Sequence, residues 1–164
     1  CDGFSYAIKN NYLKVIQIDS DLSHNPQDIP RLINNSTNYD LVIGSRYVNG
    51  ISIINWPISR LFLSYFANVY AKTITGMNIK DCTSGFKCID IDILKNINLD
   101  TIHSQGYSFQ IELHYLSYRK NYKIIEIPII FKDREYGDSK MSKRIILEAI
   151  FVVPLLRLKT LFPK

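Results

Sequence analysis

The stretch that decides the fold is KVIQIDSD at residues 14–21, a short apolar run that ends in two carboxylates. Residues 14–18 predict a buried β-strand, and Asp19-Ser20-Asp21 follows at its carboxyl end, where open α/β sheets bind their ligands. Carboxylates two residues apart in an extended chain point to the same side. Such a pair favours Mg²⁺ or Mn²⁺, which can neutralise a nucleotide diphosphate. A bare Asp-x-Asp also occurs in turns and helix caps, so the neighbouring segments must decide.

Working outward from this strand, the chain alternates strands with helices, which predicts an α/β fold. Pro26 and Pro57 each open a helix, and Gly76 ends the longest early one. The chain begins inside a helix that leads straight into a strand, so we expect a fragment that lacks the first strands of its sheet. The expected strands are 14–18, 40–43, 86–89, 123–127 and 129–132, and the expected helices are 3–10, 27–35, 58–75, 92–96, 108–120 and one from about 142.

The composition describes an ordinary globular domain with a small positive charge. The chain has 164 residues, of which 46% are hydrophobic and 21% charged, which excludes disorder, collagen and coiled coil. The net charge of +5 suits an anionic ligand or a membrane surface, and no nucleic-acid partner is expected. Cys1, Cys82 and Cys88 lack metal or disulfide spacing and are expected to be reduced thiols. The apolar run at 149–156 is too short to span a bilayer.

Six ordered segments extend the pattern: VIQIDSDLSHNPQDIPRLI, DLVIGSRYVNG, NWPISRLFLS, DCTSGFK, GYSFQIE and GDSKMSKR. With these segments the sequence resembles the polyprenyl-phosphate (dolichol-phosphate) mannosyltransferases, inverting glycosyltransferases with a GT-A fold. The resemblance covers residues 3–149. It implies a Rossmann-like, nucleotide-diphospho-sugar transferase fold with a mixed sheet flanked by helices, incomplete at the N-terminus. Residues 1–147 would form this domain, and 148–164 an apolar and basic helix in contact with a membrane surface.

On the donor side, the resemblance assigns Asp19 and Asp21 to the divalent metal, Mg²⁺ or Mn²⁺, and to the donor pyrophosphate. Ser23 stands where some family members have a glutamine ligand, and its hydroxyl is expected as the third metal ligand. His24 is expected to be a hydrogen-bonding turn residue. His103 and His114 show no partner spacing and are expected to be structural.

On the acceptor side, the resemblance assigns Arg46, Arg60 and Ser64 to the lipid phosphate. A guanidinium binds phosphate bidentately. Arg60 lies in the first turn of a helix, where anions are favoured, and Ser64 shares its face one turn later. Trp56 is expected either to anchor the fold or to contact lipid, and the sequence does not separate these roles.

The remaining candidates surround the expected reacting centre. Asp81 matches a family position near that centre, and Gly85 lets backbone come close to a ligand. Gln110 and Glu112 resemble residues that face the sugar. Arg134 and Lys140 lie in a basic loop that could close over the phosphates.

The expected reaction is the transfer of mannose from GDP-mannose to a polyprenyl phosphate. A lipid monophosphate is mostly dianionic at pH 7, so it needs aligning cations and no general base. The expected partners are the two substrates, the membrane surface and a membrane-anchoring subunit. The expected location is peripheral, on the cytoplasmic face of the endoplasmic reticulum or of a prokaryotic plasma membrane.

Three alternatives stay open at the level of sequence. A glucosyl homologue would use a UDP-sugar. A phosphatase with Asp19 as its nucleophile would leave the arginines and the NWP segment unexplained. A truncated remnant would bind only a membrane or a partner subunit.

Overall fold

The computed structural model describes residues 2–97, 99, 102, 104–133 and 143–161, and within the last helix it describes the side chains of 149–158. Its centre is a four-stranded mixed sheet in the order β1 (Lys14–Gln17), β4 (Lys87–Asp90), β2 (Leu41–Ser45) and β5 (Ile124–Pro128). Strand β4 is antiparallel to both of its neighbours, whereas β2 and β5 are parallel. The predicted α/β class with a mixed sheet flanked by helices is therefore confirmed.

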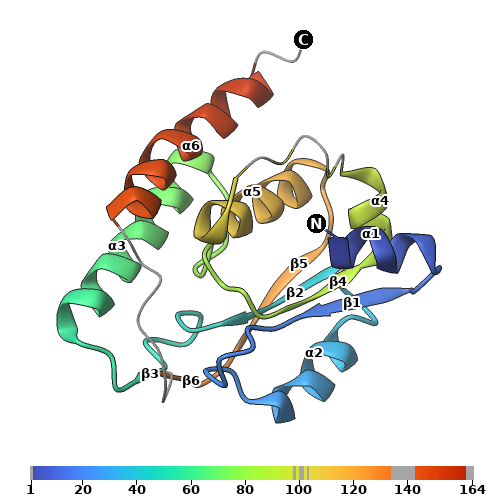
Figure 1. The fold of residues 1–164 in the computed structure, drawn as a ribbon, viewed down its shortest axis with the longest axis horizontal. Helices are drawn as coiled ribbons and strands as arrows, with labels where there is room; N and C mark the ends of the chain where they lie inside the picture. Colours follow the sequence, from blue (N-terminus) through green and yellow to red (C-terminus); the bar gives the residue numbers. More distant parts are fainter. Residues whose placement is uncertain (1, 98, 100–101, 103, 134–142, 162–164) are drawn as a thin grey trace.

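Helices cover both faces of this sheet (Figure 1). On one face lie α1 (Asp2–Lys9), α4 (Ile91–Asn96) and α5 (Gly106–Arg119). On the other lies α2 (Ile29–Asn35), which continues from a single 3₁₀ turn, Pro26–Asp28. The strands alternate as a sheet between two layers requires: Leu41 and Ile43 join the core under α5, and Val42 joins the core under α2.

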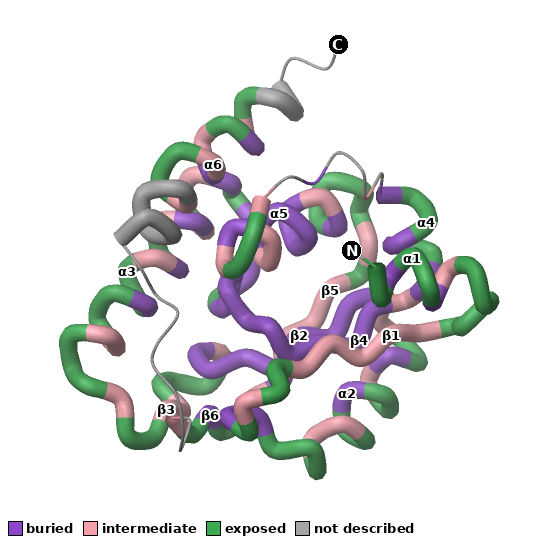
Figure 2. Tube along the Cα trace, in the orientation of Figure 1, coloured by how far each residue is buried: buried purple, intermediate pink, exposed green. Residues whose placement is uncertain are grey.

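Two long helices form a layer beside α5, namely α3 (Ile58–Thr75) and α6 (Lys143–Leu161). Helix α3 has the predicted bounds, because Pro57 precedes its first turn and Gly76 ends it in the left-handed conformation at φ 74°. Helix α6 packs against α3 and α5 and runs without interruption across residue 147, where a domain boundary was expected. Figure 2 shows that the buried residues gather in the sheet and α5, while much of α3 faces solvent. Among the described residues, we find no helix with the length and apolar character needed to cross a bilayer.

Three predicted features are wrong in detail. Strand β1 is not buried, because it ends the described sheet with β4 as its one neighbour, and all four of its residues are partly exposed. Strand β2 does not stop before Gly44 but runs to Ser45, and a side chain at Gly44 would press on Phe86 and Ile129 at 3.0–3.1 Å. Residues 46–55, in which the sequence predicted no strand, contain β3 (Ile53–Ile54), which pairs in parallel with β6 (Phe131–Lys132).

Candidate active site

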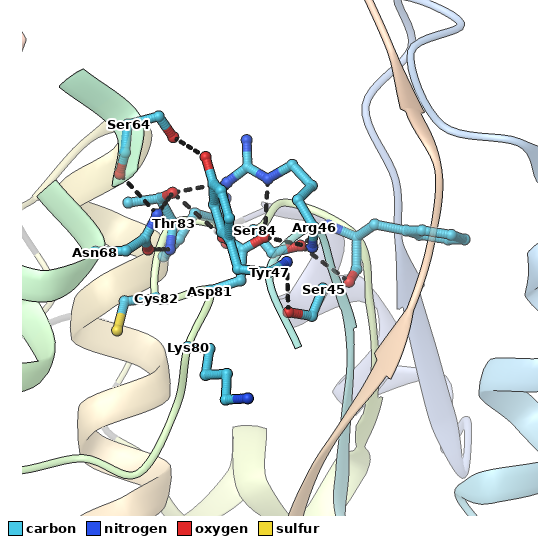
Figure 3. A network of polar contacts seen from close by, with 12 residues as sticks. Ser45, Arg46, Tyr47, Ser64, Asn68, Lys80, Asp81, Cys82, Thr83 and Ser84 are labelled. Carbon is cyan, nitrogen blue, oxygen red and sulfur yellow. Dashed lines mark hydrogen bonds and ion pairs between the residues drawn. The ribbon is translucent and has the colours of Figure 1, made fainter. Parts of the chain in front are cut away.

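The centre of the candidate site is an ion pair between Arg46 and Asp81 (Figure 3). Arg46 directly follows β2, and Asp81 lies in the loop that leads into β4. The guanidinium Nε and Nη2 donate to the two carboxylate oxygens at 2.8 and 2.6 Å, and the backbone N–H of Arg46 donates to the same carboxylate at 2.9 Å. This bidentate geometry fixes the plane of the guanidinium.

Both members of this pair lie in the protein interior. Arg46 is 5% exposed and Asp81 is fully buried. Burial by itself would lower the pKa of Arg46, but the adjacent Asp81 carboxylate outweighs it and the pKa is raised. Arg46 is therefore a permanent cation whose Nη1 points away from Asp81, without a hydrogen bond to any described residue (Figure 3).

A polar network connects this pair to α3. Arg46 Nη2 also donates to Thr83 Oγ1 at 2.8 Å, and the Thr83 backbone N–H donates to Asn68 Oδ1 at 3.2 Å. One turn earlier in α3, Ser64 Oγ accepts a hydrogen bond from the Tyr47 hydroxyl at 2.8 Å. The structure thus brings the predicted residues Arg46, Asp81 and Ser64 into one network, with Thr83 and Asn68 as members that the sequence did not indicate.

Glu126 holds the Asp81 loop in place from β5. Its carboxylate accepts the backbone N–H groups of Lys80 at 2.7 Å and of Asp81 at 2.8 Å. Glu126 was not among the residues predicted from the sequence. Its one signal was an acidic residue inside the apolar strand run IIEIP.

Asp19 lies on the other side of the same loop, against Gly85. A Cβ at Gly85 would lie 2.9 Å from both carboxylate oxygens of Asp19, so only glycine permits this approach. His24 Nε2 lies 3.3 Å from Asp19 Oδ2 and donates to it, while the ring packs against Phe86 and Phe131. His24 forms a hydrogen bond as expected, with the predicted donor carboxylate, but it lies in an isolated bridge with Phe131 and not in a turn.

The chain is not extended at the second carboxylate, which corrects the sequence analysis. Residues 20–21 form a turn, and Leu22 follows with φ 62°. Ser23 then folds back onto Asp21: its hydroxyl and its backbone N–H donate to Asp21 Oδ1 at 2.5 and 3.2 Å. The turn places Ser23 beside the carboxylate with which it was predicted to share a metal.

The oxygens of Asp19, Asp21 and Ser23 suit a hard divalent cation that also coordinates the phosphate oxygens of a bound substrate. No cluster of three or more His, Cys, Asp or Glu side chains suited to a metal occurs in the described part of the chain. Mg²⁺, however, commonly uses one or two carboxylates together with water and substrate phosphate oxygens. The side chain of Asp19 is 52% exposed, so its carboxylate is open to a cation of this kind. Asp19 and Asp21, with Ser23 beside them, are the residues that would hold the ion.

A buried lysine that the sequence analysis did not single out lies beneath these groups. Lys87 is fully buried in β4, and its Nζ lies 2.7 Å from Gln110 Oε1 and 2.6 Å from His114 Nε2. Burial lowers its pKa to about 7, although the charges of Asp81 and Asp19 act to raise it. Burial, and then the nearby Lys87, hold the pKa of His114 well below its ordinary value. His114 is thus a buried structural residue, as expected, and a neighbour of the site.

The second predicted arginine lies beside the first but pairs elsewhere. Arg60 Nη1 donates to Asp133 Oδ1 at 2.9 Å, and its guanidinium carbon lies 4.1 Å from the ring centre of Trp56. The Trp56 ring also lies 5.7 Å from the Arg46 guanidinium carbon, so one indole contacts both cations. Trp56 Nε1 and Arg60 Nε are buried donors that lack an acceptor among the described residues.

An apolar cavity of about 360 Å³ opens beside Arg46. Its walls come from α3, α5 and α6, and its polar edge comes from Arg46, Ser64 and Thr83. The other lining residues are Trp56, Leu63, Phe66, Ala67, Tyr70, Tyr107, Ile111, Ala149, Ile150 and Val153. Among the described lining residues Arg46 is the one cation, and a cation beside apolar walls suits a ligand with an anionic head and a hydrocarbon chain.

The other predicted site residues are only partly accounted for. Glu112 is buried in α5 and accepts a short hydrogen bond from the Ser104 hydroxyl. Arg134, Lys140 and His103 lie outside the described residues. The roles of all predicted site residues in catalysis stay predictions.

Comparison with known proteins gives the site its context. No protein-family model matches the chain. It is 40% identical over 148 residues, 90% of its length, to "Undecaprenyl-phosphate mannosyltransferase" of Micrococcus luteus. It is also 40% identical over 152 residues, 92% of its length, to "Polyprenol monophosphomannose synthase" of Mycolicibacterium smegmatis. The chain spans 61% and 57% of these two relatives.

Identity at this level over nine-tenths of the chain establishes homology to glycosyltransferases. Within that class, the chain is homologous to the polyprenyl-phosphate mannosyltransferases, which confirms the family resemblance found in its motifs.

Proposed function

We propose that this chain transfers mannose from GDP-mannose to a polyprenyl phosphate with inversion at the anomeric carbon, with the help of Mg²⁺ or Mn²⁺. The observation that carries the proposal is the apolar cavity that has Arg46 among its lining residues. A polyprenyl phosphate needs both parts of this site, since its isoprene units require apolar walls and its phosphate requires a cation. The names of the two homologues support the same acceptor.

In this proposal Arg46 aligns the acceptor phosphate. Asp81 and Thr83 hold Nε and Nη2, and the remaining Nη1 faces the ligand. A phosphate oxygen attacks the anomeric carbon, the bond from that carbon to the diphosphate oxygen breaks, and the electron pair leaves with GDP. No proton moves, because the phosphate is already a dianion at pH 7.

Asp19 and Asp21 serve the donor in the same proposal. A bound divalent cation would neutralise the charge of the departing diphosphate. Gly85 leaves room for the Asp19 carboxylate, and His24 orients it. Arg60 would add a second positive charge for the lipid phosphate, since its guanidinium lies against the same Trp56 ring as that of Arg46.

The membrane location is part of the proposal. Exposed apolar side chains on α3 include Ile58, Phe62 and Phe66, and those on α6 include Phe151 and Leu155. The cavity lies between these two helices, so a lipid could enter it from a membrane surface. A peripheral position on the cytoplasmic face, with a membrane-anchoring subunit, fits this arrangement.

The test is a transfer assay with a variant that fills the cavity. Ala67→Trp should raise the KM for polyprenyl phosphate tenfold or more and leave GDP-mannose binding unchanged, because Ala67 lines only the apolar part of the site. Thr73→Trp, on an exposed position of the same helix, is the matched control. An unchanged KM in Ala67→Trp would refute the cavity as the acceptor site. Transfer from UDP-glucose in preference to GDP-mannose would refute the proposed donor.

A further inference from the structure

Lys87 is a buried amino group that contacts no carboxylate among the described residues. In the described part of the chain its Nζ makes hydrogen bonds to Gln110 Oε1 and His114 Nε2 alone. Burying a charge costs free energy unless nearby groups compensate for it. A side chain held under such conditions needs an explanation, and packing does not supply one because leucine or methionine would fill the space.

The direction of each hydrogen bond in this cluster can be derived. His114 Nδ1 lies 3.0 Å from the carbonyl oxygen of Cys82, which can only accept, so Nδ1 carries the hydrogen. Since the histidine is neutral, Nε2 is an acceptor. Lys87 therefore donates to His114 with or without its extra proton, and with a second N–H it donates to Gln110 Oε1.

This direction fixes the polarity of the Gln110 amide. Up to its pKa of about 7 Lys87 is mostly an ammonium, which has only donors, so Gln110 turns its carbonyl oxygen toward Lys87 and its NH₂ group away. Gln110 lies early in α5 and is partly exposed, and its NH₂ group has no acceptor among the described residues. The charges of Asp19 and Asp81 both act on Lys87, and His114 contacts the backbone of the 81–85 loop at Cys82, so the cluster adjoins the site.

We propose that Lys87 is a positioning residue that sets the polarity of Gln110, so that Gln110 donates an N–H to an oxygen of the donor substrate. That oxygen belongs either to the hexose or to the diphosphate. The inference rests on the proposed function for the identity of the donor. It adds a specific hydrogen bond and the residue that orients it.

A double-mutant cycle tests the proposal in the full chain. Lys87→Met, Gln110→Ala and the double variant are each titrated with GDP-mannose and with GDP in the presence of Mg²⁺ by calorimetry. Lys95→Met, on an exposed part of α4, is the control and should bind both ligands as the wild type does. We expect each single variant to lose about tenfold in affinity for GDP-mannose, the scale of one hydrogen bond. The double variant should lose no more, because Lys87 acts through Gln110.

The pattern across the two ligands identifies the oxygen. A loss for GDP-mannose with GDP unchanged assigns the hydrogen bond to the hexose, and an equal loss for both assigns it to the diphosphate. Additive losses in the cycle, or no loss, would overturn the proposal. If Lys87→Met does not fold, Gln110→Glu decides: it keeps an acceptor for Lys87 but removes the donor, so unchanged GDP-mannose affinity would overturn the proposal. Wild-type mannose transfer, measured alongside, tests the proposed function separately.

Discussion

At the scale of single residues, the site depends on two opposite charges that are buried together in the interior. Arg46 and Asp81 form such a pair, with exposures of 5% and 0%. Removing one partner of a buried pair costs far more than removing one partner at the surface, because the remaining charge stays buried. The catalytic role predicted for Asp81 thus coincides with a structural one.

Asp81→Asn should lower the free energy of unfolding by about 3 kcal/mol or more, because Arg46 would lose its counter-charge. Chemical denaturation measures the change. Asp92→Asn is the control, since that exposed side chain lies 3.6 Å from Lys95, and its cost should stay below about 1 kcal/mol. Similar costs for the two variants would show that the buried pair contributes little.

Gly85→Ala should weaken the metal-dependent binding of GDP-mannose about tenfold, because the new methyl group would displace the Asp19 carboxylate. Calorimetry with and without Mg²⁺ provides the measurement. Gly3→Ala in α1 meets no atom within 4 Å and should leave binding unchanged. Wild-type affinity in Gly85→Ala would remove Asp19 from the donor site.

The sequence revealed the charged residues of the site more readily than their partners. Arg46 and Asp81 were both candidates, but their pairing depends on tertiary contacts between β2 and a distant loop. Lys87 and Glu126 escaped notice because each lies inside an apolar strand, where a single charged residue reads as a solvent-facing position. The burial of Lys87 becomes evident only in the folded structure, where helices cover both faces of the sheet around β4.

At the scale of elements, the sequence predicted the boundaries that nearby residues determine. It did not predict those that depend on pairing with a strand far away in the chain. Helix α3 follows from Pro57 and Gly76, two signals that act within one turn of the chain. Strand β3 has two residues and exists through its pairing with β6, which no local pattern encodes. For the same reason β1 was expected to be buried: its composition is apolar, but burial depends on neighbours on both sides.

The apolar faces of α3 and α6 lead to a prediction about membranes. Replacing Phe62, Phe66 and Phe151 by serine should reduce cosedimentation with anionic phospholipid vesicles at least tenfold. Burying each exposed phenylalanine side chain in the membrane surface should contribute about 1.5–3 kcal/mol to binding. Tyr6→Ser, an exposed aromatic on the distant helix α1, is the control and should bind as the wild type does. Undiminished binding by the triple variant would place the membrane contact elsewhere.

At the scale of the whole molecule, the buried lysine makes stability depend on pH. The pKa of Lys87 is lowered from 10.5 to about 7, so between these values the unfolded chain binds more protons than the folded one. Stability should therefore rise with pH from about 7, at up to about 1.4 kcal/mol per pH unit.

Denaturation of the wild type and of Lys87→Met from pH 7 to 9 isolates this effect, because the variant should lack the rise. The range stops at 9 because burial raises the pKa of Cys82 from 9.0 to about 12, which lowers stability at higher pH. Parallel pH profiles for the two proteins would show that Lys87 keeps its charge throughout this range.

The loop from Asp81 to Gly85 has a consequence for how the two proposed substrates would bind. Its first residue, Asp81, holds the Arg46 guanidinium, and its last, Gly85, abuts the Asp19 carboxylate. These five consecutive residues therefore line two half-sites, the proposed acceptor half-site at Arg46 and the proposed donor half-site at Asp19. Occupancy of one half-site should then alter the free energy of filling the other, and thermodynamic reciprocity requires the same factor in both directions. Affinity for a short-chain polyprenyl phosphate, measured with and without saturating GDP, should differ severalfold. Equal affinities would mean that the loop is a rigid partition, across which each substrate binds as though the other were absent.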